Sequence, residues 1–236
     1  MGKRVIAIDA DSSPNLAQNL GLSESESAKI VPVADDTELI RLKTGTTYSG
    51  VFRLTFTVDD IIQTRTVTTP SGVNLMVMGT VHAVDAGCNC PAHAVVKALL
   101  RHLIVEKEEI VILDMEAGIE HLGRGTAGHV DLLIIVSDSN RKSLETAGSI
   151  HRLAGASEIC RTGMIGNRVT GQRDENVIKN FAQQNGIPIL TLVPFDQMIT
   201  DAGITGNAPD PKNSPAVAIL RELASALARS KNHPGI

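Results

Sequence analysis

The chain has 236 residues, enough for one large α/β domain, and its 42% hydrophobic and 20% charged content is typical of a globular protein. The net charge of −4, the scattered basic residues and the near absence of Tyr and Trp argue against nucleic acid as a partner. No apolar run approaches the ~20 residues that span a bilayer, and the N-terminus is a charged strand. We therefore predict a cytoplasmic protein without membrane contact.

Short apolar strands alternate with amphipathic helices along most of the chain. The predicted strands cover residues 5–8, 73–78, 110–113, 132–136, 159–165 and 187–193. The predicted helices cover residues 14–20, 140–154 and 172–184, with one more beginning near Pro91 and a last one capped by Ser214 with Pro215 in its first turn. This alternation predicts the α/β class, with one mostly parallel, doubly wound sheet in a single domain over residues 1–236. A polar excursion over residues 22–60 interrupts it.

The segment 110–126 carries the strongest functional pattern. The continuous apolar run 110–113 predicts a buried parallel strand that ends at Asp114, and the chain then turns through Gly118. Open α/β sheets bind ligands at this carboxyl edge, where an acid can hold Mg²⁺ and a glycine lets backbone N–H groups approach a phosphate. Asp9 and Asp11 follow the strand 5–8 at the same edge. Asp11 could position an attacking water or hold Mg²⁺, and the alternative is a solvated loop acid.

Polar side chains also follow the strands 159–165 and 187–193. Asn167 can pair with the edge of adenine and Arg168 can stack on a base, although Asn is also a common turn residue. The tripeptide Pro194-Phe195-Asp196 could form the other wall of a base pocket, so Pro194 and Asp196 are further candidates for nucleotide binding.

Cys88 and Cys90 form the motif with the most specific chemistry. Two thiolates one residue apart suit Zn²⁺, Cu(I) or Ni²⁺, but a closed tetrahedral site needs four ligands. A two-fold dimer would supply two from each protomer, whereas His82 or His93 could complete a site within one chain. A redox pair and an incidental exposed pair are the alternatives. Cys160, in an apolar strand, is predicted to be a core residue.

Together these segments resemble the MinD/ParA-type ATPases of the P-loop class. More narrowly, they resemble the CooC-type ATPases that mature carbon monoxide dehydrogenase. The resemblance spans nearly the whole chain, and its most specific part is the segment 114–125. The other matching segments are Ala7–Asp11, Cys88–Pro91 and Gly166–Val169.

The resemblance implies a homodimer that uses ATP and Mg²⁺ to insert nickel into the apo-enzyme of carbon monoxide dehydrogenase. Asp11 would order the attacking water, Asp114 would be the Walker B acid, and the N–H of Gly118 would meet the γ-phosphate. Asn167, with Arg168, would contact adenine. Cys88 and Cys90 would hold Ni²⁺ or Zn²⁺ at a site shared by the two protomers.

The sequence departs from that family at its start. The family places a strand, a GKGGxGK[ST] phosphate loop and a helix before the strand equivalent to residues 5–8, whereas here the only Gly-Lys pair is Gly2-Lys3. Ser12 and Ser13 also precede Pro14, where the subgroup has proline directly after the acid. We therefore expect a chain that lacks the first strand–P-loop–helix unit and is inactive as an ATPase, because nothing offsets the charge of a polyphosphate.

Two other functions remain open on the sequence. A nucleotide-independent, dimeric metal-binding or adaptor protein would use the Cys88/Cys90 pair alone. A partition or positioning ATPase is the third possibility, but the paired cysteines have no purpose in it.

Overall fold

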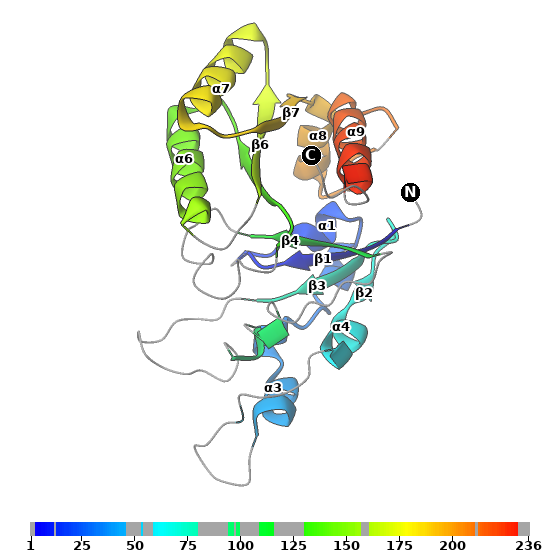
Figure 1. Ribbon diagram of the computed structural model, residues 1–236. Helices are drawn as coiled ribbons and strands as arrows, with labels where there is room; N and C mark the ends of the chain where they lie inside the picture. The colour runs from blue at the N-terminus through cyan, green and yellow to red at the C-terminus, as the bar shows by residue number, and fades with distance from the viewer. Residues whose placement is uncertain are drawn as a thin grey trace. The chain divides into compact units, whose positions relative to one another are not determined.

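The computed structural model describes residues 3–11, 13–45, 53, 59–79, 94–96, 98–99, 109–115, 130–156, 161–210 and 212–230 (Figure 1). The chain divides into two compact units, which we call the N-terminal unit (Gly2–Glu116) and the C-terminal unit (Ala117–Ile236). Each unit is described by itself. Among the described helices, none is both long and apolar enough to cross a membrane.

The N-terminal unit contains a four-stranded sheet in the order β2-β3-β1-β4. Strand β1 lies parallel to both β3 and β4, and the short β2 lies antiparallel to β3. The predicted strands 5–8, 73–78 and 110–113 are thereby confirmed; β2 has only two residues, too few for a recognisable alternation. The strands are β1 (Arg4–Asp9), β2 (Val67–Thr68), β3 (Asn74–Val77) and β4 (Glu109–Asp114).

Both faces of this sheet are covered, because alternate residues of β1 point to opposite sides. Ile6 and Ile8 belong to a core that includes Ile61 of α4 (Asp59–Arg65). Ala7, on the opposite face, packs in a second core with Ala17 of α1 (Leu16–Asn19). The described residues 94–96 and 98–99 are helical, and their Val95 and Leu99 are buried in the first core, as the apolar spacing predicts.

The region 22–60 is more regular than the polar excursion we predicted. It includes α2 (Glu24–Ser27), a 3₁₀ turn η1 (Val33–Asp35), α3 (Thr37–Thr44) and the start of α4. Its acids stabilise helix starts: Glu26 forms a capping box with Ser23, and Asp36 accepts the Leu39 N–H at 2.9 Å. Sequence polarity here therefore marks helix caps.

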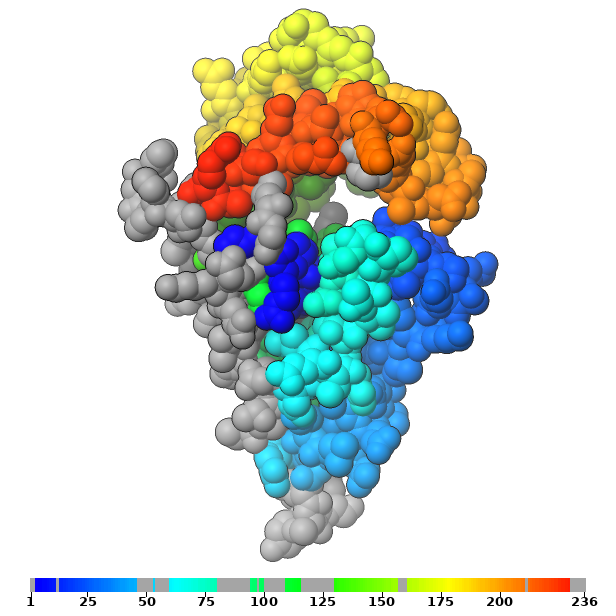
Figure 2. Space-filling model, turned by 90° about the vertical axis from the view of Figure 1, so that its right-hand side faces the viewer, coloured from blue at the N-terminus to red at the C-terminus, as the bar shows by residue number. Residues whose placement is uncertain are grey.

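The C-terminal unit contains a three-stranded, fully parallel sheet in the order β5-β6-β7. Helices α6 and α7 pack on one face, and α9 packs on the other, where Ala216 meets Ile165 and Val193 (Figure 1). In the space-filling view α9, orange to red, lies on the surface of this unit (Figure 2). The α/β, doubly wound arrangement is thus confirmed, although the described strands form two sheets where the sequence predicts one. The elements are β5 (Leu133–Ser137), α6 (Arg141–Gly155), β6 (Thr162–Val169), α7 (Gln172–Asn185), β7 (Ile189–Pro194), α8 (Gln197–Thr205) and α9 (Pro215–Ser230).

Two glycines set the close packing in the middle of this sheet. A Cβ atom on Gly163 would lie 2.6 Å from the Leu190 Cγ, and one on Gly166 would lie 2.5 Å from the Leu192 Cδ2. The absence of a Cβ atom at both positions leaves room for the Leu190 and Leu192 side chains of β7 against β6.

The prediction that 110–113 is buried on both faces is wrong. Ile112 is 54% exposed, because β4 is the outermost strand of the described sheet and the helices near α1 cover β1 and β3. On β5, Ile134 and Val136 are likewise exposed, because α9 packs over β6 and β7. A continuous apolar run therefore does not guarantee two-sided burial at the edge of a sheet.

Candidate functional site

Two acids end neighbouring parallel strands in the N-terminal unit. In the β1–β4 register Asp9 lies opposite Asp114, and the Ala10 N–H donates to the Asp114 carbonyl oxygen at 2.9 Å. The pairing places both residues at the carboxyl edge of the sheet, as the sequence predicts. This edge is where α/β sheets bind ligands.

The buried Asp9 carboxylate is occupied by backbone donors. Its Oδ2 accepts the N–H groups of Asn15 at 3.0 Å and Leu16 at 2.9 Å, and its Oδ1 accepts the Asp11 N–H at 3.2 Å. Asp9 therefore closes the loop between β1 and α1. Its oxygens hold backbone N–H groups and so stabilise this loop. Its nucleotide-binding role stays a prediction.

The Asp11 side chain is more accessible. It is half-buried, and its Oδ1 accepts the Ser13 N–H at 2.7 Å, which forms a local turn. No described bond engages its second oxygen, so Asp11 has more capacity than Asp9 to meet a water molecule or a cation.

Replacing Asp9 tests this division of tasks. We expect Asp9→Ala to lower the free energy of unfolding by about 2 kcal/mol, because three backbone donors to a charged acceptor lose their partner. Asp11→Ala removes a single local bond and should cost clearly less. Urea denaturation measures both, and equal losses would contradict the structural role of Asp9.

Asp114 is the acid to whose carboxylate no described residue donates a hydrogen bond or ion pair. The residue is exposed, but packing around its carboxylate removes enough water to raise its pKa, and the charges of Asp9 and Asp11 raise it further. An acid with a raised pKa at a ligand-binding edge is a candidate for cation contact. The described residues contain no cluster of three or more His, Cys, Asp or Glu placed to hold a metal ion. A cation at Asp114 would therefore depend on water or ligand oxygens as well.

The raised pKa of Asp114 predicts how stability depends on pH. The folded state binds this proton more tightly than the unfolded state, so stability falls as pH rises from 3.8, the ordinary aspartate value, through the raised value. We expect Asp114→Asn to raise the free energy of unfolding at pH 7 by about 0.5 kcal/mol, the scale of interactions between accessible charges. Denaturation at pH 3 is the control, because the Asp114 side chain is then largely neutral, as the asparagine of the variant always is. A gain that is equally large at pH 3 would contradict the electrostatic origin.

A second group of predicted residues lies at the carboxyl ends of β6 and β7 in the C-terminal unit. The β6–β7 register is irregular between Gly166 and Val169, so Asn167 and Arg168 form a bulge. Arg168 has φ 56°, in the left-handed region that few residues with large side chains adopt. Its N–H donates to the Asn167 Oδ1 at 2.9 Å, and its guanidinium lies 5.5 Å from the centre of the Phe195 ring.

Pro194 and Asp196 flank Phe195 but differ from it in role. Pro194 ends β7. The Asp196 carboxylate accepts the Met198 N–H of α8 at 2.9 Å, the Ala216 N–H of α9 at 3.3 Å and the Ser214 hydroxyl at 2.6 Å, so it caps both helices. The Ser214 bond is the main reason that the pKa of Asp196 is lowered. Asp196 thus ties α8 to α9. As with Asp9, its nucleotide-binding role stays a prediction.

Sequence reasoning did not single out the Phe195 side chain or the Asp174 network. Asp174 accepts the Thr170 N–H at 2.9 Å and the Ser139 hydroxyl at 3.0 Å, which joins the loops after β5 and β6 and lowers its pKa, chiefly through the Thr170 hydroxyl. The usable signal was the position of Phe195 directly after a strand, in a chain with four Phe. Gly118, Cys88, Cys90 and Cys160 lie outside the described residues.

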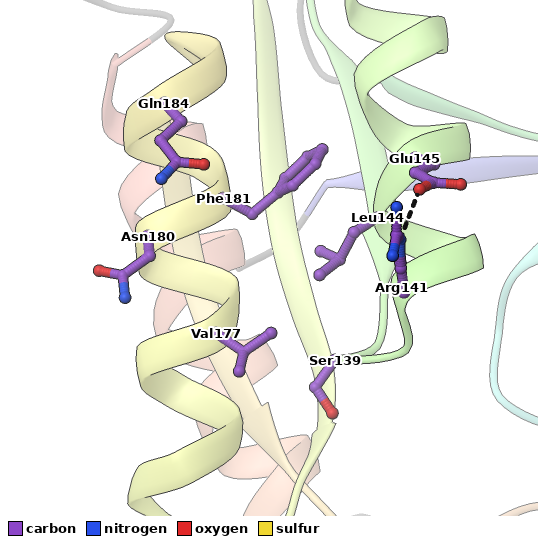
Figure 3. Close-up of a pocket in the computed structure, with 8 residues that line it drawn as sticks. All are labelled: Ser139, Arg141, Leu144, Glu145, Val177, Asn180, Phe181 and Gln184. Atoms are coloured by element: carbon purple, nitrogen blue, oxygen red, sulfur yellow. Dashed lines mark hydrogen bonds and ion pairs between the residues drawn. The ribbon is translucent and has the colours of Figure 1, made fainter.

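A groove between α6 and α7 lies apart from these strand ends (Figure 3). Its volume is about 430 Å³, and Leu144, Val177 and Phe181 point into it. An Arg141–Glu145 ion pair of 2.8 Å lies at its border. The two titratable side chains in its lining, Arg141 and Glu145, pair with each other, and Leu144, Val177 and Phe181 make the rest of the groove largely apolar.

Comparisons with known proteins identify the family to which the chain belongs. The model of the CobQ/CobB/MinD/ParA nucleotide-binding domain matches residues 1–209. The chain belongs to this family. It is similar to an uncharacterized ATP-binding protein of Methanocaldococcus jannaschii, with 36% identity over 98% of this chain and 89% of that protein. It is also similar to the carbon monoxide dehydrogenase accessory protein CooC of Rhodospirillum rubrum, with 41% identity over 87% of this chain and 78% of that protein.

Solved structures of the same family share the fold. A ParA family ATPase from Chlorobium tepidum matches with a TM-score of 0.68 at 19% identity, over 95% of this chain and 86% of that one. The cell division ATPase MinD of Pyrococcus furiosus matches with a TM-score of 0.64 at 16% identity, over 97% and 87%. The predicted P-loop NTPase fold of the MinD/ParA type and the resemblance to CooC are thereby confirmed.

Proposed function

We propose that this protein is an ATP-dependent maturation factor that serves carbon monoxide dehydrogenase by delivering nickel. The acid pair at the ends of β1 and β4 carries the proposal, in a chain 41% identical to the accessory protein CooC. The Cys88-Asn89-Cys90 motif supports a metal cargo, because two thiolates from each protomer of a homodimer make a four-coordinate site for Ni²⁺ or Zn²⁺.

The chemistry of the acids fits a nucleotide-bound Mg²⁺. The raised pKa of Asp114 marks negative charge that a cation would relieve, and carboxylate oxygens are ligands that Mg²⁺ accepts along with waters and phosphate oxygens. Asp114 and Asp11 would hold the ion, directly or through water, since the Asp9 oxygens already accept backbone N–H groups. Mg²⁺ supplies charge neutralisation to the phosphates. By the family resemblance, Asp11 would orient a water, and Gly118, outside the described residues, would offer its N–H to the γ-phosphate.

The residues at the carboxyl ends of β6 and β7 can contact the base of the nucleotide. The Arg168 N–H holds the Asn167 Oδ1, which fixes the orientation of the amide and directs its NH₂ group to other partners. An amide in a fixed orientation can donate to adenine N7 and accept from N6. Asn167 with Arg168 is therefore the proposed adenine contact.

A nucleotide-independent metal-binding adaptor is the second candidate. It is favoured by one observation: the sequence contains no GxxxxGK[ST] motif to cradle the phosphates. The two candidate functions share the cysteine site, and they differ in whether the protein binds and needs ATP.

The cysteine site is tested by metal content. We expect the dimer, loaded anaerobically with nickel and desalted, to keep about one ion per two chains, and Cys88→Ser or Cys90→Ser to lose it, because a tetrahedral site then has two ligands in place of four. Cys160→Ser removes a thiol outside the motif and is the matched control. Unchanged nickel in Cys88→Ser, measured by elemental analysis, would remove the metal-delivery function.

The nucleotide is tested by equilibrium dialysis with ATP. We expect weak retention that increases with Mg²⁺, because three acids at one sheet edge repel a bare polyphosphate, and we expect hydrolysis at the background rate. Asp114→Asn should reduce the effect of Mg²⁺, whereas Asp201→Asn, on the exposed surface of α8, should leave it unchanged. Nickel binding without any ATP retention would favour the adaptor. ATP hydrolysis by the wild-type chain well above the background rate would contradict the expected lack of ATPase activity.

A further inference from the structure

We propose that the groove between α6 and α7 docks an acidic, amphipathic helix on the surface of the apo-enzyme of carbon monoxide dehydrogenase. The groove is lined by Leu144, Val177 and Phe181 and bordered by the Arg141–Glu145 ion pair. This inference rests on the proposed maturation function and deepens it by assigning the surface that meets the client enzyme. The groove lies within the C-terminal unit.

The first support is the apolar centre of the groove. Leu144 and Phe181 pack into the core beneath the two helices, whereas Val177 is 40% exposed and lies one turn before Phe181 on α7 (Figure 3). A Cβ atom on Gly148 would lie 3.1 Å from the Phe181 Cζ, so the glycine lets this ring lie against α6. The apolar side of α7 therefore extends past its buried face and reaches solvent between the two helices.

The second support is the polar rim around this centre. Asn180 and Gln184 line the groove from α7 and are exposed, and the Ser139 hydroxyl donates to Asp174 at 3.0 Å. An apolar centre within a polar rim is the anatomy of a protein–protein interface, whereas a small-ligand pocket encloses most of its ligand. An amphipathic helix fits a groove between two helices, because it inserts apolar residues spaced by three or four positions.

The third support is the charge of α6, which favours an acidic partner. The chain has a net charge of −4, but the charged side chains of α6 are mostly basic: Arg141, Lys142 and Arg152 against Glu145. Glu145 pairs with Arg141, and no described residue forms an ion pair with Lys142 or Arg152. The Arg152 Nη1 would lie 3.6 Å from a Cβ atom on Gly148, which places this guanidinium on the side of α6 that faces Phe181.

The start of α6 also departs from what the helix dipole favours. Its first two residues are Arg141 and Lys142, and its first turn contains no acid, although a helix N-terminus favours negative charge. Helix α7 begins as the dipole favours, with Asp174 and Glu175 in its first turn. Acidic side chains of a docked helix would offset the repulsion at the start of α6, so this charge and the apolar groove favour the same occupant.

The first experiment is a photo-crosslink to the purified apo-enzyme of carbon monoxide dehydrogenase. The photoreactive residue benzoylphenylalanine replaces Val177, and mass spectrometry identifies the client peptide that it captures. Leu220 on α9 is the matched control position, because it is 39% exposed. We expect the Val177 position to capture an acidic segment with apolar residues at helical spacing, and the Leu220 position not to capture it. Capture of a basic or non-helical segment would overturn the proposal.

The second experiment compares affinities for the apo-enzyme by biolayer interferometry. Val177→Glu should weaken binding about tenfold or more, as the loss of a contact at the centre of an interface predicts. Leu220→Glu should leave it unchanged. Nickel content, circular dichroism and thermal midpoints confirm that each variant keeps its metal and its fold.

A charge variant tests the acidic partner. Lys142→Glu should weaken binding about tenfold at low ionic strength and much less at high salt, because salt screens the attraction. It should also raise the thermal midpoint, since an acid favours the start of a helix, so weaker binding would not reflect a loss of the fold. Lys212→Glu, exposed in the turn before α9, is the matched control. Equal effects of the two charge variants on binding would overturn the acidic partner.

The outcomes separate this surface from the proposed function. Binding and nickel transfer by the wild-type chain that Val177→Glu leaves unchanged would overturn the groove as the docking surface and leave the maturation function standing. Weaker binding of Val177→Glu, with nickel retained at the wild-type level, would support the docking surface. Failure of the wild-type chain to bind the apo-enzyme would overturn both.

Discussion

The pairing of β1 with β4 is the constraint on which the N-terminal unit depends. It aligns six residues of each strand and ends by placing Asp9 opposite Asp114. Two carboxylates at one sheet edge repel each other, so the fold must relieve at least one of them. It relieves Asp9 with three backbone N–H groups, which also fix the start of α1. No described residue donates a hydrogen bond to the Asp114 carboxylate, and its pKa is raised.

This asymmetry separates an acid with a structural task, Asp9, from the acid that we propose to meet a cation, Asp114. Both residues are aspartates that end apolar strands, so the sequence pattern treats them alike. The difference comes from the loop after β1, which turns back and directs its N–H groups at Asp9. The same distinction holds in the C-terminal unit, where Asp196 caps α8 and binds Ser214 while its neighbour Phe195 stays exposed.

Much of the fold could be predicted because it depends on local periodicity. The long helices α6, α7 and α9 and the central strands carry apolar residues at clear spacings, and the Ser214 cap acts as predicted, accepting the Val217 N–H at 3.1 Å. The region 22–60 was misjudged because its acids cap short helices that are too brief to show a period. Helix α8 was missed for a related reason: its ends are set by the Asp196 cap and the left-handed Gly206, not by an apolar stripe. The geometry of the strand ends could not be predicted from the sequence, because it depends on contacts between different strands. Sequence spacing indicates that Asn167 and Phe195 both follow strands, but not that a bulge in β6 brings Arg168 over the phenyl ring.

The departures from local rules are unevenly distributed. Arg168, the one described residue other than glycine with a positive φ, lies at one carboxyl edge, and Asp114, with its raised pKa, lies at another. Away from these edges, buried polar groups are satisfied: within the described residues, the Ser27 hydroxyl is the only buried side-chain polar atom without a hydrogen-bond partner. Within the described residues, strain and like charges are therefore found at strand ends, where a ligand could offset their cost in stability. The proposed nucleotide would act at these strand ends, since a cation bound beside Asp114 would reduce its repulsion with the Asp9 and Asp11 carboxylates.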